Sequence, residues 1–207
     1  MKSRFARHAA FWLIMPIVLV LSAPAIPDRG LFMISEGERA ANRQMLGDSA
    51  YRELERRVDQ RFTRWFIDSG IIRLSFQALA PKGGKQVFEA AAQNSFASGR
   101  YLTRVWTAIY KALYRFEVAM HWLAALGIIV FACLMDGIMR RRIKTYEFGY
   151  ANPVAFHISG HGLLAVLGLI TVTPFMPFAI QQWTWPVLIG LAGLVAWKAA
   201  ESYQSSL

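Results

Sequence analysis

Apolar residues gather in four stretches of this chain, and charged residues lie almost wholly between them. A helix needs about 20 mostly apolar residues to cross the roughly 30 Å hydrocarbon core of a bilayer. The pattern therefore predicts an all-α integral membrane protein with four transmembrane helices. Only the second stretch has the full length, and the four run from Ala9 to Ile26, Val118 to Met139, Leu163 to Ile180 and Pro186 to Ala200.

The long segment between the first two stretches has helical periodicity and not the alternation typical of strands. A first run ends near Gly70, and its apolar stripe consists of Tyr51, Leu54, Val58, Phe62 and Trp65. After a loop at 81–84, a second run continues into the next apolar stretch through Phe88, Ala92, Leu102, Val105, Ile109, Leu113 and Phe116. We predict two amphipathic helices, the second forming one long helix from roughly Arg100 through the bilayer. Such helices pack on each other, lie on the outer leaflet or present a stripe to another subunit.

Basic residues beside the apolar stretches predict the orientation, because cytoplasmic loops next to membrane spans retain Lys and Arg. Lys2, Arg4 and Arg7 precede the first stretch, and Lys198 lies near the end of the fourth. The second stretch is followed by Arg140, Arg141, Arg142 and Lys144. Both termini are therefore expected in the cytoplasm.

This orientation divides the chain into five parts. They are an N-terminal transmembrane anchor at 1–27, a periplasmic amphipathic helical segment at 28–117, a second transmembrane helix at 118–139, a basic cytoplasmic loop at 140–162, and a C-terminal transmembrane hairpin with a short tail at 163–207. The periplasmic segment carries 15 basic and 10 acidic residues. Long loops cross the membrane largely regardless of charge, so this excess does not change the orientation.

The first stretch also resembles a secretory signal, because a basic start and an apolar run precede Ala23-Pro24-Ala25. Cleavage there would leave three transmembrane helices. Pro16 and Pro24 interrupt the run, and cleavage would leave Ile26-Pro27 as an unusual new N-terminus. A retained anchor is the favoured interpretation.

The formal net charge of +10 raises the question of nucleic-acid binding. The basic residues, however, lie next to membrane ends or alternate with acidic residues on helices, so no direct nucleic-acid binding is expected. Membrane lipids are expected partners. Cys133 is the single cysteine, which excludes an internal disulfide.

Polar groups at membrane depth are costly and therefore often functional. Asp136 stands four residues before Arg140, a spacing that predicts an ion pair at the cytoplasmic interface. His157 and His161 share one helix face and are weak candidates for metal ligands. A small transporter or a metal-dependent membrane enzyme that uses Asp136, His157 and His161 is the alternative function.

Catalytic motifs are missing: the chain has no G-x-x-x-x-G-K-[ST] loop, no G-x-S-x-G and no H-E-x-x-H. We therefore expect no enzyme activity, no cofactor and no metal. Gly190 and Gly193 give the fourth stretch a small face for helix packing, and Pro174 and Pro177 are expected to kink the third.

The stretch from Arg140 to His157, RRRIKTYEFGYANPVAFH, followed by His161, resembles a membrane-protein family of unknown function. That family is carried by integrating conjugative elements and conjugative plasmids. The resemblance extends to the first apolar stretch, to Trp65-Phe66 ahead of Gly70 and to the paired C-terminal stretches. It implies an inner-membrane accessory component of DNA conjugation, often encoded beside the coupling ATPase that feeds a type IV secretion channel. The family has no established catalytic residues, so the resemblance assigns none.

Together these features favour a scaffold of a conjugative DNA-transfer apparatus that docks the coupling ATPase or other transfer proteins. The expected partner-binding residues are Arg140, Arg141, Arg142, Lys144, Glu147, His157 and His161. A homo-oligomer or an immunity-type membrane protein is a third possibility.

Overall fold

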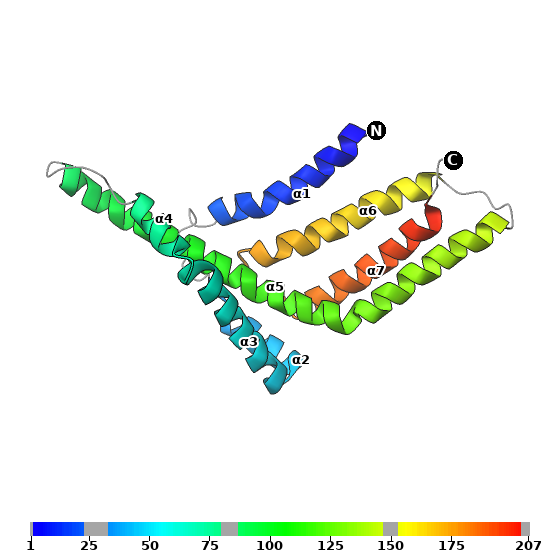
Figure 1. Ribbon diagram of the computed structural model, residues 1–207, viewed down its shortest axis with the longest axis horizontal. Helices are drawn as coiled ribbons and strands as arrows, with labels where there is room; N and C mark the ends of the chain where they lie inside the picture. The colour runs from blue at the N-terminus through cyan, green and yellow to red at the C-terminus, as the bar shows by residue number, and fades with distance from the viewer. Residues whose placement is uncertain (1, 23–32, 80–86, 147–152, 204–207) are drawn as a thin grey trace. The chain divides into compact units, whose positions relative to one another are not determined.

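The computed structural model describes residues 2–22, 33–79, 87–146 and 153–203, which form helices and connecting turns without strands (Figure 1). The helices are α1 (Lys2–Ser22), α2 (Glu36–Leu46), α3 (Asp48–Phe62), α4 (Ile71–Leu79), α5 (Val87–Tyr146), α6 (Pro153–Val172) and α7 (Thr184–Ser202). The π-helical turn η3 (Thr63–Ile67) follows α3, and the 3₁₀ turn η4 (Thr173–Phe175) follows α6. The all-α prediction is therefore confirmed for the described residues.

The chain forms two compact units. Unit 1 comprises Met1–Pro16, Val118–Thr173 and Gln182–Leu207, and unit 2 comprises Ile17–Glu117 and Pro174–Gln181. Helices α1 and α5 contribute to both units. The continuous helix from Val87 to Tyr146 confirms that the second amphipathic run and the following apolar stretch form one long helix.

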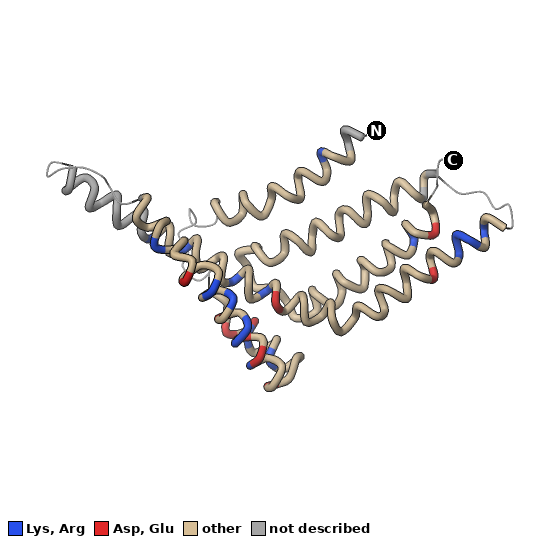
Figure 2. Tube along the Cα trace, in the orientation of Figure 1, with Lys and Arg blue, Asp and Glu red and all other residues tan. Residues whose placement is uncertain are grey.

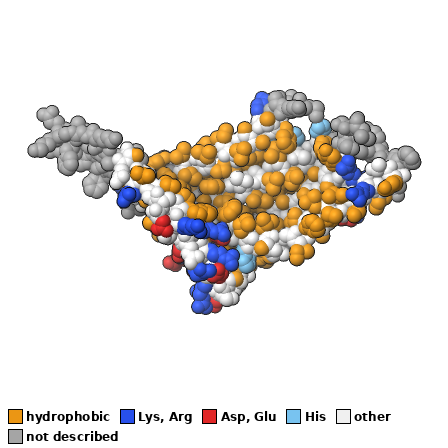
Figure 3. Space-filling view, viewed as in Figure 1, with side chains coloured by type: hydrophobic (Ala, Val, Ile, Leu, Met, Phe, Trp, Pro, Cys, Tyr) orange, Lys and Arg blue, Asp and Glu red, His pale blue; other side chains and the backbone are white. Residues whose placement is uncertain are grey.

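Three described helices are long and apolar enough to cross a membrane: Phe5–Ser22 in α1, Arg100–Tyr146 in α5 and Phe156–Phe175 in α6 with η4. The fourth predicted span lies in helix α7, which carries Lys198 and Glu201 near its end and is not among the three helices that are long and apolar enough. Hydrophobic side chains lie on the outside of these helices (Figure 3). In the part of α5 that belongs to unit 1, Ile128 is 80% exposed and Phe131 is 64% exposed. Helix α6 carries no charged residue along its length (Figure 2). Outward apolar surfaces of this kind are typical of helices that face lipid.

Small residues bring the helices of unit 1 together, as expected where backbones approach closely in a membrane. Gly193 of α7 faces Val130 of α5, and Gly162 of α6 faces Val195 of α7. The small face predicted for α7 is thus used at Gly193, whereas the position above Gly190 is open.

Gly137 provides a test of this packing. A methyl group at Gly137 of α5 would come within 2.5 Å of the Trp197 carbonyl oxygen, whereas one at Gly127 of the same helix would meet nothing within 4 Å. We expect Gly137→Ala to lower the unfolding free energy in detergent by about 1–3 kcal/mol, because overpacking forces α5 and α7 apart. The matched Gly127→Ala variant should be neutral or slightly stabilising, because alanine favours the helix. Equal melting temperatures for the two variants would contradict this packing.

The third apolar stretch folds differently from the prediction. We expected a transmembrane helix from Leu163 to Ile180 kinked at Pro174 and Pro177, but α6 begins at Pro153 and ends at Val172. Proline is favourable in the first turn of a helix, and a later proline disfavours helix at the residue before it. Helices α5 and α6 also cover 140–146 and 153–162, so most of the expected cytoplasmic loop is helical.

Unit 2 contains more helices than the two we predicted. The apolar periodicity of the sequence did not predict α2 or α4. Ser35 caps α2 by accepting a hydrogen bond from the Glu38 N–H at 3.1 Å. Gly47 then allows the turn into α3, since its φ of 82° is one that other residues rarely adopt. The end of the first amphipathic run near Gly70, where φ is 74°, is confirmed.

The apolar stripe of α3 is buried at Tyr51, Leu54 and Val58, but Trp65 is 49% exposed. The wider π turn between Thr63 and Ile67 changes the register, which rotates Trp65 out of the stripe. The Phe62 ring lies 5.2 Å from that of Tyr110 in α5, and the Tyr110 hydroxyl donates to Asp59 at 2.6 Å. Of the three roles considered for the amphipathic helices, packing on each other therefore holds for α3 and α5.

Candidate functional site

The carboxylate of Asp136 joins α5 to α7 at the end of unit 1 where α5 is basic. It accepts hydrogen bonds from Arg140 Nε at 2.8 Å and from Trp197 Nε1 at 2.7 Å. The Arg140 guanidinium also lies 5.2 Å from the centre of the Trp197 ring, within the range of a cation–π contact. The predicted pairing of Asp136 with Arg140 is confirmed.

Two further predicted partner-binding residues form contacts within the chain. Lys144 pairs with Glu201 of α7, which also accepts a hydrogen bond from Lys198 at 2.7 Å. The Arg141 guanidinium lies 4.7 Å from the centre of the Tyr203 ring. These residues therefore hold the ends of α5 and α7 together.

Arg142 differs from its neighbours. Its side chain is exposed, and it forms no ion pair with an acid among residues 2–22, 33–79, 87–146 and 153–203. Ile143 and Tyr146 beside it are 54% and 83% exposed. Glu147, the next residue of the predicted set, lies outside the described residues. We name Arg142, Ile143 and Tyr146 the α5 end surface.

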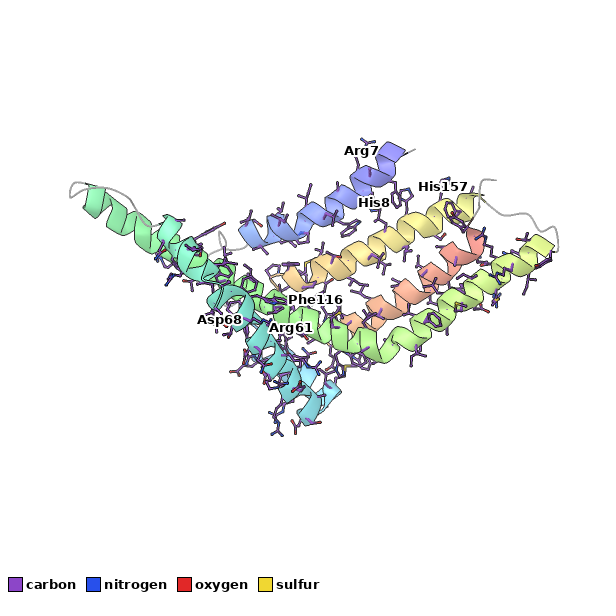
Figure 4. All side chains as sticks on the ribbon, in the orientation of Figure 1. Arg7, His8, Arg61, Asp68, Phe116 and His157 are labelled. Atoms are coloured by element: carbon purple, nitrogen blue, oxygen red, sulfur yellow. The ribbon has the colours of Figure 1, made fainter. Side chains whose placement is uncertain are left out.

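His157 and His161 lie on α6, but His161 contacts α1. Its Nδ1 is 3.2 Å from Nδ1 of His8, so one imidazole donates an N–H to the other. The two ring centres are 5.5 Å apart, as expected when the two nitrogens point directly at each other. His157 is exposed and its ring lies 5.8 Å from that of Phe156 (Figure 4).

The part of the chain that the structure describes contains no group of three or more His, Cys, Asp or Glu residues arranged to hold a metal. The structure therefore does not bring Asp136, His157 and His161 together as one site. The pairing of His8 with His161 was not anticipated. In the structure, Trp12, four residues after His8 on α1, packs against Gly168 of α6. The sequence alone does not show that α1 and α6 are neighbours.

Unit 2 contains a buried ion pair that the sequence analysis missed. The Arg115 side chain is 1% exposed and that of Glu38 is 3% exposed. Arg115 donates Nε to Glu38 Oε1 and Nη2 to Glu38 Oε2, both at 2.7 Å. This two-pronged geometry is the strongest arrangement for an arginine–carboxylate pair.

The same arginine holds the segment that follows η4. Arg115 donates to the carbonyl oxygens of Met176 at 2.5 Å and Phe178 at 2.7 Å. Lys111, one helical turn earlier on α5, donates to the Pro177 carbonyl at 2.9 Å. Glu38 in turn accepts from the Ile180 N–H at 3.4 Å. Four backbone groups of the segment after α6 are thereby satisfied by side chains of α2 and α5.

Comparison with known proteins agrees with a role in DNA transfer. Residues 28–204 match the family described as IncC plasmid conjugative DNA transfer protein DtrJ-like. No curated protein and no solved structure matches the chain. The match covers most of the chain and confirms the resemblance to a conjugation-associated family. The protein therefore belongs to the DtrJ-like family of conjugative DNA transfer proteins.

Proposed function

We propose that this protein is a non-enzymatic component of the inner-membrane part of a conjugative DNA-transfer apparatus, with four transmembrane helices and both termini in the cytoplasm. The observation that supports this proposal is the gathering of basic residues at one end of unit 1 (Figure 2). His8 beside Arg7 contacts His161 of α6, Phe156 of α6 contacts Tyr203 after α7, and Lys144 of α5 pairs with Glu201. The basic ends of α1, α5 and α7 thus lie together, as the positive-inside rule requires of one cytoplasmic face.

Contacts inside unit 2 support a periplasmic position for residues 28–117. The Tyr101 hydroxyl of α5 donates to the carbonyl of Leu21, in the last turn of α1, at 2.6 Å. Further along α5, Lys111 and Arg115 bind the segment between α6 and α7. A helix rises about 1.5 Å per residue, so Tyr101 and Arg115 are about 21 Å apart along α5. Both contacts are with the outer ends of proposed membrane helices, so this part of α5 lies along the outer surface and its membrane-spanning part begins near Val118.

The cytoplasmic partner is a transfer protein, with the coupling ATPase as the first candidate. The α5 end surface presents an arginine and a tyrosine, residue types enriched in the energetic centres of protein interfaces. The neighbouring basic residues already have contacts within the chain. Arg140 binds Asp136 of α5, Lys144 pairs with Glu201 of α7, and Arg141 lies against the Tyr203 ring. Docking is therefore assigned to Arg142, Ile143 and Tyr146.

Arg142→Glu tests the docking proposal. We expect the variant to recover at least about fivefold less coupling ATPase from donor cells, because a central charged contact contributes more than about 1 kcal/mol. Recovery is measured by photo-crosslinking from an amino acid placed at Ile143, followed by purification of the tagged protein. Three basic residues remain beside Arg142, so the orientation of α5 should be kept.

The matched control is Arg52→Glu, an exposed arginine of α3 in the proposed periplasmic segment. It should leave recovery unchanged. Equal recovery with Arg142→Glu and wild type, at equal membrane insertion, would contradict docking at the α5 end surface. Crosslinks to copies of the same chain alone would instead favour a homo-oligomer.

A further inference from the structure

The turn η3 and helix α4 carry large apolar side chains on the outside of unit 2. Trp65 and Ile67 in η3 and Ile71 and Leu74 in α4 are 46–58% exposed. Beside them, Phe62, Ile72, Phe76 and Trp106 line an apolar groove of about 380 Å³ between α4 and α5. A group of exposed apolar side chains of this kind marks a surface that contacts a membrane or another protein. We name Trp65, Ile67, Ile71 and Leu74 the α4 surface.

Hydrogen bonds place α4 close to the point where α1 ends. Trp106 Nε1 of α5 donates to the Ser75 hydroxyl of α4 at 3.1 Å. Five residues earlier on α5, Tyr101 donates to the Leu21 carbonyl in the last turn of α1. Five residues correspond to about 7.5 Å of helix. If α1 crosses the membrane as proposed, α4 lies at the outer surface of the bilayer.

Two arginines next to the α4 surface have no acidic partner among the residues that the structure describes. Arg64 and Arg73 are exposed and form no ion pair with any carboxylate in the described part of the chain. On α3, by contrast, Arg56 and Arg57 share Glu53, whose pKa their hydrogen bonds lower to about 2. The cations beside the apolar side chains are therefore available to an external anion.

We propose that η3 and α4 form an interfacial segment that inserts the α4 surface into the outer leaflet of the inner membrane and binds anionic phospholipid headgroups through Arg64 and Arg73. The inference rests on the proposed transmembrane position of α1. An apolar face flanked by cations is the pattern of helices that lie in the plane of an anionic membrane.

Cysteine labelling tests this proposal on the full-length protein. Cys133, the single native cysteine, is replaced by serine, and single cysteines are introduced as Leu74→Cys on α4, Gln44→Cys on α2 and Leu13→Cys on α1. Each variant is labelled with an environment-sensitive fluorophore and reconstituted in phosphatidylcholine bilayers with or without phosphatidylglycerol. Lipids with a spin label at shallow or deep positions report the depth of each site.

The label at Leu74→Cys should be quenched most by the shallow spin label, because interfacial helices lie about 5–10 Å into the boundary of headgroups and acyl chains. The label at Gln44→Cys should stay in water, and the label at Leu13→Cys should be quenched most by the deep spin label. Phosphatidylglycerol should strengthen quenching at Leu74→Cys, and the added changes Arg64→Gln and Arg73→Gln should remove that effect.

Failure of the inference and failure of the proposed membrane topology give different results. A label at Leu74→Cys that behaves like the one at Gln44→Cys, while Leu13→Cys is deeply quenched, would overturn the inference and leave the topology standing. Lack of deep quenching at Leu13→Cys would overturn the proposed transmembrane position of α1. Shallow quenching at Leu74→Cys that is independent of phosphatidylglycerol and of both arginines would overturn headgroup binding. A protein bound at the α4 surface would keep the label in an apolar environment without any quenching by lipid, which would also overturn the proposal.

Discussion

Arg115→Met should destabilise the protein by about 3–5 kcal/mol, because removing one partner of a buried ion pair leaves the other charge without compensation. In this chain the abandoned group is Glu38, whose side chain is 3% exposed. The carbonyls of Met176 and Phe178 lose their donors in the same substitution. Thermal unfolding and protease resistance of the purified protein in detergent measure the effect.

The control is Arg57→Ala, which removes an exposed ion pair with Glu53 on α3. Exposed pairs contribute only about 0–1 kcal/mol, so this variant should unfold near the wild-type temperature. The double variant Glu38→Leu with Arg115→Met should recover part of the loss, because a buried ion pair is often replaceable by apolar residues of similar size. An Arg115→Met protein as stable as Arg57→Ala would show that the buried pair does not hold unit 2 together.

The helical class and the long helix α5 could be predicted because their signals are local. Apolar periodicity from Leu102 to Phe116 continues into the stretch that begins at Val118, and no helix-breaking residue lies between them. The pairing of Asp136 with Arg140 could be predicted for the same reason, since four residues bring side chains together on any helix. The predicted limits of the third span, Leu163 to Ile180, were wrong because apolar content does not mark helix ends, whereas Pro153 starts α6 and Pro174 follows its end.

The contacts that sequence reasoning missed are long-range. Glu38 and Arg115 are far apart in the chain, and Arg115 also binds backbone carbonyls, which leave no trace in residue types. Lys111 and Arg115, one turn apart in an otherwise aromatic and apolar run, were the available signal. The contact of His161 with His8 could not be predicted, because helix spacing identifies a shared face but not the helix that packs against it.

The second large effect is expected in the transfer process itself. An in-frame deletion of this gene from its native element should reduce mating to the level of a donor that lacks the coupling ATPase. The reason is that loss of a membrane docking component would separate the ATPase from the transfer channel. Wild-type protein supplied in trans should restore transfer, whereas Arg115→Met should not, because its fold is disrupted.

Two variants separate folding from docking in the same assay. Arg57→Ala should complement fully, since its ion pair is exposed. Arg142→Glu should insert normally in the membrane and still fail to restore full transfer, because the α5 end surface is altered while Arg140, Arg141 and Lys144 remain in place.

Mating frequency of the deletion donor, with and without the wild-type gene in trans, is the most direct measurement of the central claim that this protein is a component of the transfer apparatus. The account predicts a large loss of transfer that the wild-type gene restores. Transfer at the wild-type frequency in the deletion donor would contradict it.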